Sequence, residues 1–277
     1  MKLLIIGGNG MAGHLMIRYF WETHPEHEVV YTTRRADGQG GLALDASDAE
    51  ATAALVRAVR PDVIVNAAGV LNQDAEAHPV RAYLVNGLLP HWLRYAADDI
   101  GARVVHISSD CVFSGERGAY AESDHPDGTS VYARSKALGE MTYGRHLTIR
   151  TSIIGPEIRT QGIGLLKWFM AQSGTVKGYA NVFWNGVTTL ELAKAVAYAL
   201  EHPEIGGLVH LTASESVNKL TLLLLFQAAF EKEDVRIVSD DAIRIDRTLV
   251  ATRKDWKYRT TGYIPMLDEL SQWMKRA

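Results

Sequence analysis

The chain has 277 residues, of which 47% are hydrophobic and 22% are charged, and its formal net charge is -3 at pH 7. These values are typical of a globular protein and exclude a disordered, fibrous or strongly basic nucleic-acid-binding chain. No apolar run approaches the roughly 18 residues that a membrane helix needs. A single cysteine, Cys111, excludes an internal disulfide and favours a reducing compartment. We therefore expect a cytoplasmic protein with neither nucleic acid nor membrane as a partner.

The first part of the chain predicts alternating strands and helices. Short apolar runs indicate the strands, and longer amphipathic stretches indicate the helices between them. The expected strands are 3–6, 28–32, 41–44, 62–65, 103–107 and 147–150, and the expected helices are 11–22, 49–59, 77–97 and 131–143. This alternation is typical of parallel βαβ units with right-handed crossovers. The predicted fold class is therefore α/β, a doubly wound parallel Rossmann-type sheet.

Beyond residue 150 the pattern becomes weaker. Residues 156–164 are loop-like, residues 174–186 have no clear periodicity, and helices are expected at 190–200, 220–231 and 266–275. We expect residues 1–155 to form a dinucleotide-binding Rossmann domain. Residues 156–277 are expected to form mainly a small C-terminal substrate-binding lobe, parts of which can return to the sheet.

A glycine-rich turn follows the first predicted strand directly. Gly7-Gly8-Asn9-Gly10-Met11-Ala12-Gly13 has the spacing Gly-x-x-Gly-x-x-Gly and opens a helix. Such glycines allow a tight turn, close approach of a pyrophosphate, and packing of the helix on the strand. The helix N-terminus supplies free N–H groups. A plain strand-to-helix turn is the alternative, but this position favours a dinucleotide site that includes Gly7, Asn9, Gly10, Met11 and Gly13.

The second strand ends in Thr32-Thr33-Arg34-Arg35, without an acidic residue. A carboxylate there would favour the ribose 2′-hydroxyl of NAD, whereas Arg34 suits the 2′-phosphate of NADP. NADPH is therefore the expected cofactor and NADH the second choice; the alternative for both arginines is a solvated loop.

Two later segments are further candidates for cofactor binding. Asp45 can accept a hydrogen bond from the adenine amino group, or else cap the next helix together with Ser47. Asn66, Ala67, Ala68 and Gly69 close the fourth strand with small residues, which lets a cofactor lie across the strand ends.

A Tyr-x-x-x-Lys pair, Tyr132 and Lys136, lies on a predicted helix, and spacing of four puts both side chains on one face. We expect the ammonium to lower the pKa of Tyr132 from its usual value of about 10. Such a tyrosine can pass a proton to a carbonyl oxygen while hydride arrives from a nicotinamide, and Lys136 can also hold the ribose. Ser109, at the end of the fifth strand, can orient the same carbonyl. The pair alone is common, but the combination with the glycine turn is specific.

Three segments carry a family resemblance. Ser108-Ser109-Asp110-Cys111-Val112-Phe113-Ser114-Gly115 is similar to the Ser-Thr-Asp-Tyr-Val-Phe-x-Gly of the dTDP-4-dehydrorhamnose reductases, which are extended short-chain dehydrogenases/reductases. The loop Tyr120-x-Glu122-x-Asp124-x-Pro126 and the strand end Arg150-Thr151-Ser152 resemble two more segments of that family. The resemblance implies a catalytic triad of Ser109, Tyr132 and Lys136 and a nucleotide-sugar substrate. Because relatives are often dimers, it also implies a homodimer.

Departures from the family pattern lie near the expected sugar pocket. Cys111 replaces a tyrosine, Ile153 stands where a tryptophan is usual, and Gly155-Pro156-Glu157-Ile158 replaces a Gly-x-Asn-Phe element. The identity of the sugar and its nucleotide therefore stays open. The candidate substrate residues are Ser109, Asp110, Val112, Trp184 and Thr188. For Trp184 the alternative is a place in the core of the small lobe.

Other residues carry weaker hypotheses. His24 and His27 flank Pro25 in a predicted loop and are interpreted as a solvated turn, so no metal site is predicted. Asn86 can anchor a proton-relay water or serve packing. Arg247 and Arg253 can neutralise a substrate diphosphate or remain surface charges.

The function predicted from these motifs is NADPH-dependent reduction of a keto group on a nucleotide-diphosphate sugar. Three alternatives stay open: an epimerase or dehydratase with tightly held NAD, a non-catalytic NADP-binding regulatory subunit, and a reductase of a non-sugar ketone.

Overall fold

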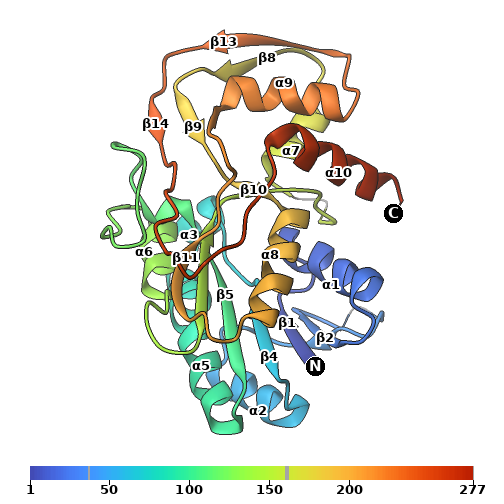
Figure 1. Cartoon of the computed structure of the whole chain (residues 1–277), viewed down its shortest axis with the longest axis vertical. Coiled ribbons are helices and arrows are strands. Elements are labelled where there is room, and N and C mark those ends of the chain that lie inside the picture. The colour runs from blue at the N-terminus through green and yellow to red at the C-terminus, as the bar shows by residue number, and fades with distance from the viewer. Residues whose placement is uncertain (37, 160–161, 277) are drawn as a thin grey trace.

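A seven-stranded parallel sheet forms the centre of the protein, in a computed structural model that describes residues 1–36, 38–159 and 162–276 (Figure 1). The strand order is β11-β6-β5-β4-β1-β2-β3, and every neighbouring pair is parallel. The strands are β1 (Lys2–Ile6), β2 (Glu28–Thr33), β3 (Leu42–Ala43), β4 (Val63–Asn66), β5 (Arg103–Ser109), β6 (Leu147–Thr151) and β11 (Gly207–His210). This order confirms the predicted α/β class.

Both faces of the sheet are covered, and the side-chain alternation of β1 shows how. Leu3 and Ile5 belong to the core cluster on one face, whereas Leu4 and Ile6 belong to the cluster on the other. The first cluster includes residues of α1 (Met11–Thr23) and α8 (Thr189–Glu201), and the second includes residues of α2 (Ala49–Val59) and α5 (Leu89–Ile100). These four side chains are all buried, which is why residues 3–6 form a continuous apolar run in the sequence.

The predicted helix 77–97 is divided into several segments. The structure has α3 (Asn72–Ala77), α4 (Pro79–Ala82), a π-helical stretch η1 (Tyr83–Leu88) and then α5. Pro79 and Pro90 each stand in the first turn of a segment, where the missing N–H costs nothing. Inside η1, the Asn86 side chain donates to Val70 O and Ser135 Oγ and accepts from Val70 N. Asn86 therefore connects the π-helical turn to the loop after β4 and to helix α6 (Val131–Leu138).

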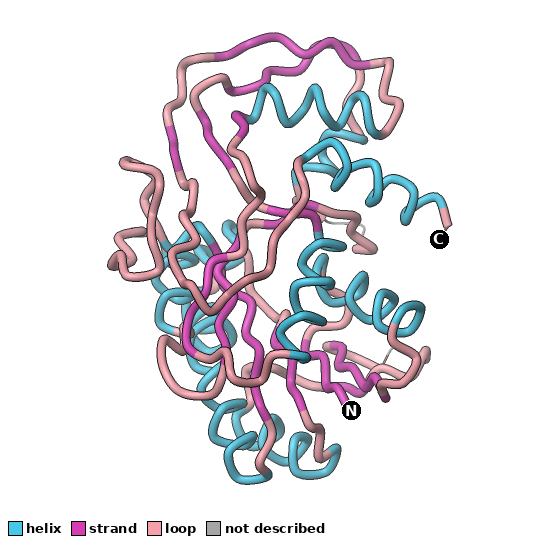
Figure 2. The backbone as a smooth tube through the Cα atoms, in the orientation of Figure 1, coloured by secondary structure: helices cyan, strands magenta, loops and turns pink. Residues whose placement is uncertain are grey.

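A smaller lobe stands beyond the carboxyl ends of the strands and is drawn at the top of Figures 1 and 2. Its largest pairing joins β8 (Gly174–Tyr179) in parallel to β13 (Val235–Asp240). Where the sequence has no clear periodicity, at 174–186, the structure has β8 and β9 (Val182–Trp184). The other lobe elements are α7 (Leu165–Met170), β12 (Val217–Asn218), α9 (Lys219–Ala229), β14 (Ile245–Asp246) and α10 (Tyr263–Lys275).

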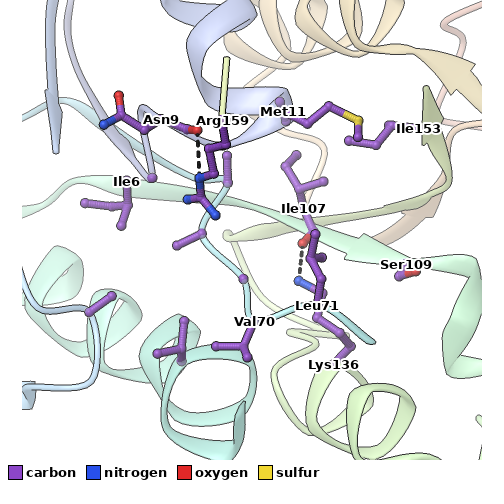
Figure 3. Close-up of a pocket in the computed structure, with 18 of the residues that line it drawn as sticks. Ile6, Asn9, Met11, Val70, Leu71, Ile107, Ser109, Lys136, Ile153 and Arg159 are labelled. Atoms are coloured by element: carbon purple, nitrogen blue, oxygen red, sulfur yellow. Dashed lines mark hydrogen bonds between the residues drawn. The ribbon is translucent and has the colours of Figure 1, made fainter. Parts of the chain in front are cut away.

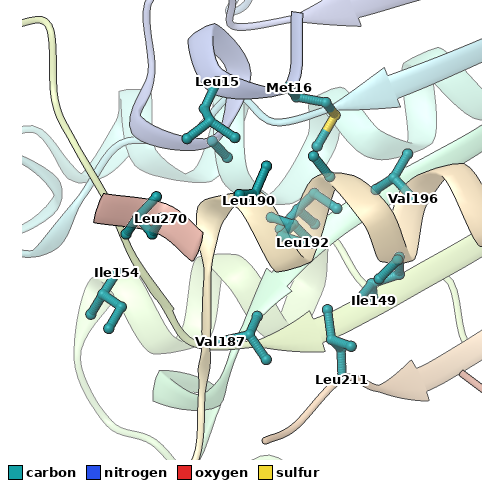
Figure 4. Packing of buried hydrophobic residues seen from close by; sticks show 14 of the residues in the cluster. Leu15, Met16, Ile149, Ile154, Val187, Leu190, Leu192, Val196, Leu211 and Leu270 are labelled. Carbon is teal, nitrogen blue, oxygen red and sulfur yellow. The ribbon is translucent and has the colours of Figure 1, made fainter. Parts of the chain in front are cut away.

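The chain beyond residue 155 does not stay in the small lobe. Helix α8 packs beside α1, and Leu190, Leu192 and Val196 of α8 belong to the same buried cluster as Leu15 and Met16 of α1 (Figure 4). Strand β11 then joins the edge of the main sheet next to β6. Residues beyond 155 therefore return to the sheet, as the sequence analysis allows, and a division at residue 155 does not separate two folding units.

Candidate active site

A groove of about 830 Å³ runs along the carboxyl ends of the central strands. The groove crosses the sheet between the neighbouring strands β1 and β4. From β1 the chain continues to β2 on one side, and from β4 it continues to β5 on the other side. Open α/β sheets bind ligands at such a switch point. Its lining joins the glycine-rich turn, the tip of β2, the ends of β4 and β5, and helix α6 (Val131–Leu138). Among the predicted residues, the lining includes Gly7, Asn9, Gly10, Met11, Arg34, Asp45, Ala67, Ala68, Gly69, Ser109, Asp110, Tyr132 and Lys136.

The turn after β1 needs its glycines for steric reasons. Gly7 has a φ of 91°, and a Cβ there would lie 2.9 Å from the Ala68 backbone. A Cβ on Gly13 would meet Gly7 O at 2.2 Å, so Gly13 lets α1 pack against the turn and does not line the groove itself. Helix α1 begins without a side-chain cap. Its first N–H groups are therefore available to an anion, which is the arrangement that a dinucleotide pyrophosphate requires.

Arginines from three segments border the other end of the groove. Arg34 at the tip of β2, Arg81 on α4 and Arg159 after β7 (Ile153–Ile154) all line it. Burial and the positive charges of Arg81 and Arg159 lower the pKa of Arg34, so the three guanidinium groups lie close enough to repel one another. Arg159 Nε donates to Asn9 O at 3.2 Å, so the side chain reaches across the groove to the glycine turn (Figure 3). A polyanion such as a 2′-phosphate or pyrophosphate would relieve this repulsion, so the donor set fits NADP.

Asp45 accepts from Ser47 N at 3.0 Å and from Ser47 Oγ at 2.6 Å. Asp45 and Ser47 thus form a local turn but do not cap α2, because Asp48 is the capping residue and accepts from Ala51 N at 2.9 Å; Asp45 also lines the groove. Asn66 is fully buried and lies outside the lining; its Oδ1 accepts from Ala68 N and its amide meets His106 Nδ1 at 3.2 Å. Asn66 thus shapes the turn that presents Ala67, Ala68 and Gly69.

Helix α6, which carries the predicted pair Tyr132 and Lys136, begins at a serine cap, in which Ser130 Oγ accepts from Ala133 N at 3.1 Å. One turn later Lys136 Nζ donates to Ile107 O of β5 at 2.8 Å (Figure 3). That bond fixes the helix against the strand end that carries Ser109. Ser109 Oγ donates to Asp110 Oδ1 at 3.2 Å and accepts from Cys111 N at 3.1 Å. Serine, tyrosine and lysine therefore face one groove, although they come from two elements.

In the structure the pKa of Tyr132 is raised, whereas the sequence analysis predicts that it is lowered. Burial raises the pKa of Tyr132 above its usual value, and a hydrogen bond with Ser109 opposes that rise. Burial also lowers the pKa of Lys136 to about 8, against the opposing charge of Glu140. The tyrosine is thus a protonated phenol at neutral pH. A phenol is the form that can donate a proton to a ketone during reduction.

A buried polar network supports the strand that carries Ser109. Ser108 Oγ donates to Glu140 Oε1 at 2.6 Å, and Arg150 donates to both oxygens of Glu140 at 2.8 and 2.6 Å. Arg150 also donates to His210 Nε2 at 3.0 Å, and His210 Nδ1 lies 2.9 Å from Val250 O. The network therefore joins β5, the segment that follows α6, β6 and β11 beside the strand end that carries Ser109.

The remaining substrate candidates lie outside the groove lining. Val112 is fully buried in a small cluster with Phe113, and Thr188 caps α8 by accepting from Glu191 N at 3.1 Å. Trp184 is 4% exposed and stacks on Tyr263, while Lys219 Nζ lies 4.6 Å from the centre of its ring. Burial raises the pKa of Cys111 to about 12, so it remains a thiol.

Several groove residues were missed from the sequence. Arg81 lies in a stretch predicted as one long helix, Arg159 and Ile163 come from a loop-like region, and Leu165 directly follows that region. Only the Gly/Pro-rich composition of that loop could have signalled a functional segment. Away from the groove, the donor atoms of His24, Glu26 and His27 lie within 4.8 Å of one another, and His24 Nδ1 meets Glu26 Oε1 at 3.2 Å.

This combination of parallel sheet, glycine turn and Ser-Tyr-Lys groove defines an NAD(P)-dependent oxidoreductase of the extended short-chain dehydrogenase/reductase class. The model of the RmlD substrate binding domain family matches residues 1–245, and the chain belongs to that family. The resemblance predicted from the motifs is thereby confirmed. In the part of the chain that the structure describes, no helix is long and apolar enough to cross a membrane.

Three known proteins show how far the similarity extends. A dTDP-4-dehydrorhamnose reductase of Escherichia coli K12 is 34% identical over 232 residues, covering 77% of this chain and 73% of that protein. The crystal structure of a hypothetical dTDP-4-dehydrorhamnose reductase from Sulfolobus tokodaii has a TM-score of 0.76 and 28% identity, covering 97% and 94% of the two chains. A dTDP-4-dehydrorhamnose reductase from Bacillus anthracis in complex with NADP shares the fold, with a TM-score of 0.83, 19% identity and coverage of 100% and 99%.

Proposed function

We propose that this protein uses NADPH to reduce a keto group on a nucleotide-diphosphate sugar, as a dTDP-4-dehydrorhamnose reductase does, in deoxysugar or surface-polysaccharide synthesis. The observation that carries the proposal is that Ser109, Tyr132 and Lys136 line the same groove as the glycine turn and Arg34. Cofactor and ketone would therefore meet at one place. We further propose a cytoplasmic homodimer in which residues 1–155 bind NADPH and residues 156–277 mainly bind the sugar nucleotide.

The chain's own residues would hold the cofactor at three points. The N-terminus of α1 and the turn Gly7–Gly10 would bind the pyrophosphate, Arg34 and Arg81 the 2′-phosphate, and Lys136 the ribose next to the nicotinamide. When bound, NADPH supplies the hydride. Met11 and Ile153, which both line the groove, would exclude water from its inner part.

Reduction then depends on where the protein places one proton. The Ser109 hydroxyl would donate a hydrogen bond to the ketone oxygen and hold it beside Tyr132. The Tyr132 phenol would transfer its proton to that oxygen as negative charge develops there. Because burial holds the pKa of Tyr132 high, the phenol stays protonated until the ketone accepts hydride. Lys136 would stabilise the phenolate that forms and would lead to its reprotonation from solvent.

The test is NADPH oxidation, followed by absorbance, with a panel of 4-keto nucleotide sugars and with NADH in parallel. We expect turnover with a dTDP-4-keto-6-deoxyhexose and a loss of about 10²–10⁴-fold in Tyr132→Phe, the range for removing a general acid. NADPH affinity should be unchanged in that variant. Tyr143→Phe is the matched control, because Tyr143 is 75% exposed and lies just beyond α6.

Other outcomes point to the remaining alternatives. Epimerised or dehydrated product with NAD retained on the purified protein would indicate an epimerase or dehydratase. Tight NADPH binding without turnover of any sugar would contradict the proposed reaction. It would indicate either a non-catalytic regulatory subunit or a reductase of a non-sugar ketone.

A further inference from the structure

Two histidines and a glutamate converge in the turn between α1 and β2 (Figure 1). His24 follows the last residue of α1, and His27 precedes Glu28, the first residue of β2. His24 Nδ1 lies 3.2 Å from Glu26 Oε1, and His27 Nδ1 lies 3.8 Å from the same oxygen. All three donor atoms lie within 4.8 Å of one another. The turn therefore gathers two imidazole nitrogens around one carboxylate oxygen.

The core of the protein holds both imidazole rings in place. Phe20 is fully buried, and its ring centre lies 5.4 Å from that of His24 and 6.2 Å from that of His27. The backbone N–H of His27 donates to His24 O at 3.0 Å and closes the turn, in which Pro25 fixes one φ angle. The two histidine side chains are 23% and 14% exposed, whereas the sequence analysis interprets this turn as solvated. A restrained turn therefore presents the two nitrogens.

The Nδ1 atom of His27 is buried and has no hydrogen bond. No described residue bonds to it, and the Glu26 oxygen at 3.8 Å is too far away to do so. A buried polar atom without a partner costs free energy, and a water molecule or an ion can supply the partner. The C-terminus of α1 also attracts positive charge, because its last carbonyl groups carry a partial negative charge and no basic residue lies in its last turn. A cation would therefore satisfy both the nitrogen and the helix end.

The three ligand atoms fit a divalent transition metal ion. Zn²⁺ binds histidine nitrogen and carboxylate oxygen at about 2.0–2.2 Å, so neighbouring ligands of a tetrahedral ion lie roughly 3.3–3.6 Å apart. The distances of 3.2 and 3.8 Å bracket this range, and rotation of the exposed Glu26 side chain or of the His24 ring would close the remaining separation. Mg²⁺ and Ca²⁺ prefer oxygen ligands, so the two imidazole nitrogens select against them.

We propose that this turn binds one Zn²⁺ or a similar divalent transition metal ion through His24 Nδ1, a carboxylate oxygen of Glu26 and His27 Nδ1, with solvent in the fourth position. The turn lies at the amino ends of the parallel strands, whereas the groove lies at their carboxyl ends, so the ion takes no part in the reduction. It fastens the end of α1 to the start of β2 instead. The inference does not depend on the proposed function.

The test is a titration of the untagged chain with ZnCl₂ in a calorimeter, together with melting temperatures in Zn²⁺, Mg²⁺ or EDTA. We expect one Zn²⁺ to bind per chain and, at a free concentration of about 100 times Kd, to raise the melting temperature by about 5 °C. Mg²⁺ should leave the melting temperature unchanged. His24→Asn and Glu26→Gln should each weaken Zn²⁺ binding by at least about 100-fold, because losing a group that only supports a ligand already costs about 10–100-fold.

A second histidine–carboxylate pair provides the matched control. His78 Nδ1 lies 3.0 Å from Asp74 Oδ1, but no third donor of this kind joins them in the described part of the chain. His78→Asn and Asp74→Asn should therefore keep both the Zn²⁺ affinity and the rise in melting temperature. Glu26→Gln decides the question even if His24→Asn unfolds, because Glu26 is exposed. If the wild type binds no Zn²⁺, or if both turn variants bind it as tightly as the wild type, the inference is wrong and the proposed reduction is unaffected.

Discussion

The main sheet and the small lobe hold their charged side chains in opposite ways. In the sheet, Arg150 and Glu140 form an ion pair with each side chain 2% exposed, and Ser108 and His210 complete the network. In the lobe, Lys275 and Glu231 form a surface pair with side chains 64% and 76% exposed. Surface pairs contribute little, whereas removing one member of a buried pair is costly. Ser109, the proposed catalytic serine, therefore lies next to a buried ion pair that restrains the strand end, whereas the ion pair compared in the lobe is exposed.

The sharpest test of this comparison removes one charge from each region. Glu140→Gln leaves the Arg150 guanidinium buried without a counter-charge, so we expect the free energy of unfolding to fall by about 3–5 kcal/mol. Glu231→Gln should change it by less than about 0.5 kcal/mol. Urea unfolding followed by far-UV circular dichroism measures both. Equal losses in the two variants would mean that burial does not distinguish the regions.

A third kind of charge, exposed but placed to bind a ligand, lies at the cofactor end of the groove. Arg34 is exposed and makes no described ion pair, so removing it should affect binding more than stability. We expect Arg34→Ala to weaken NADPH binding about 10–100-fold, the range for losing charged hydrogen bonds, and to leave NADH binding unchanged. Fluorescence titration with both cofactors measures this, with Arg57→Ala on α2 as the control. A parallel loss for NADH would show that Arg34 does not contact the 2′-phosphate.

The site residues that were predicted from the sequence share one property: each lies in a motif whose neighbours in sequence are also its neighbours in space. The glycine turn, the end of β5 and the pair Tyr132 and Lys136 each lie within one strand-to-helix unit or one helix. Their backbone geometry follows from local rules for turns, caps and helix spacing. The parallel order of the strands then brings these motifs to one edge, which is why both the fold and most of the groove could be predicted.

The residues that were missed depend on contacts between distant segments. Strands β8 and β13 pair in parallel although the chain between them forms α8, β11 and α9, and β8 begins and ends near glycines that blur its alternation. Arg81 could not be placed because the region was read as one helix, although Pro79 and Pro90 mark its divisions. Trp184 and Thr188 are predicted substrate residues, and in the structure Trp184 is buried in the lobe while Thr188 caps α8, so both lie outside the groove lining. Sequence patterns predict such roles poorly because they do not say which segments meet.

The smallest expected effect concerns pH and the same buried network. Burial and the neighbouring Arg150 lower the pKa of His210 from 6.5 to about 4, so the folded protein holds the ring neutral, whereas the unfolded chain binds a proton near 6.5. The stability that this provides is present above about pH 6.5 and is lost as pH falls toward 4. Each pKa unit corresponds to about 1.4 kcal/mol, so at pH 5 we expect a loss of about 1–2 kcal/mol.

Melting temperatures measured from pH 7.5 to 5 should fall less in His210→Asn than in the wild type. The control His78→Asn removes an exposed histidine and should behave like the wild type. If all three proteins lose the same amount, the network does not depend on a neutral His210 and the sheet's buried charges are less tightly constrained than their geometry indicates.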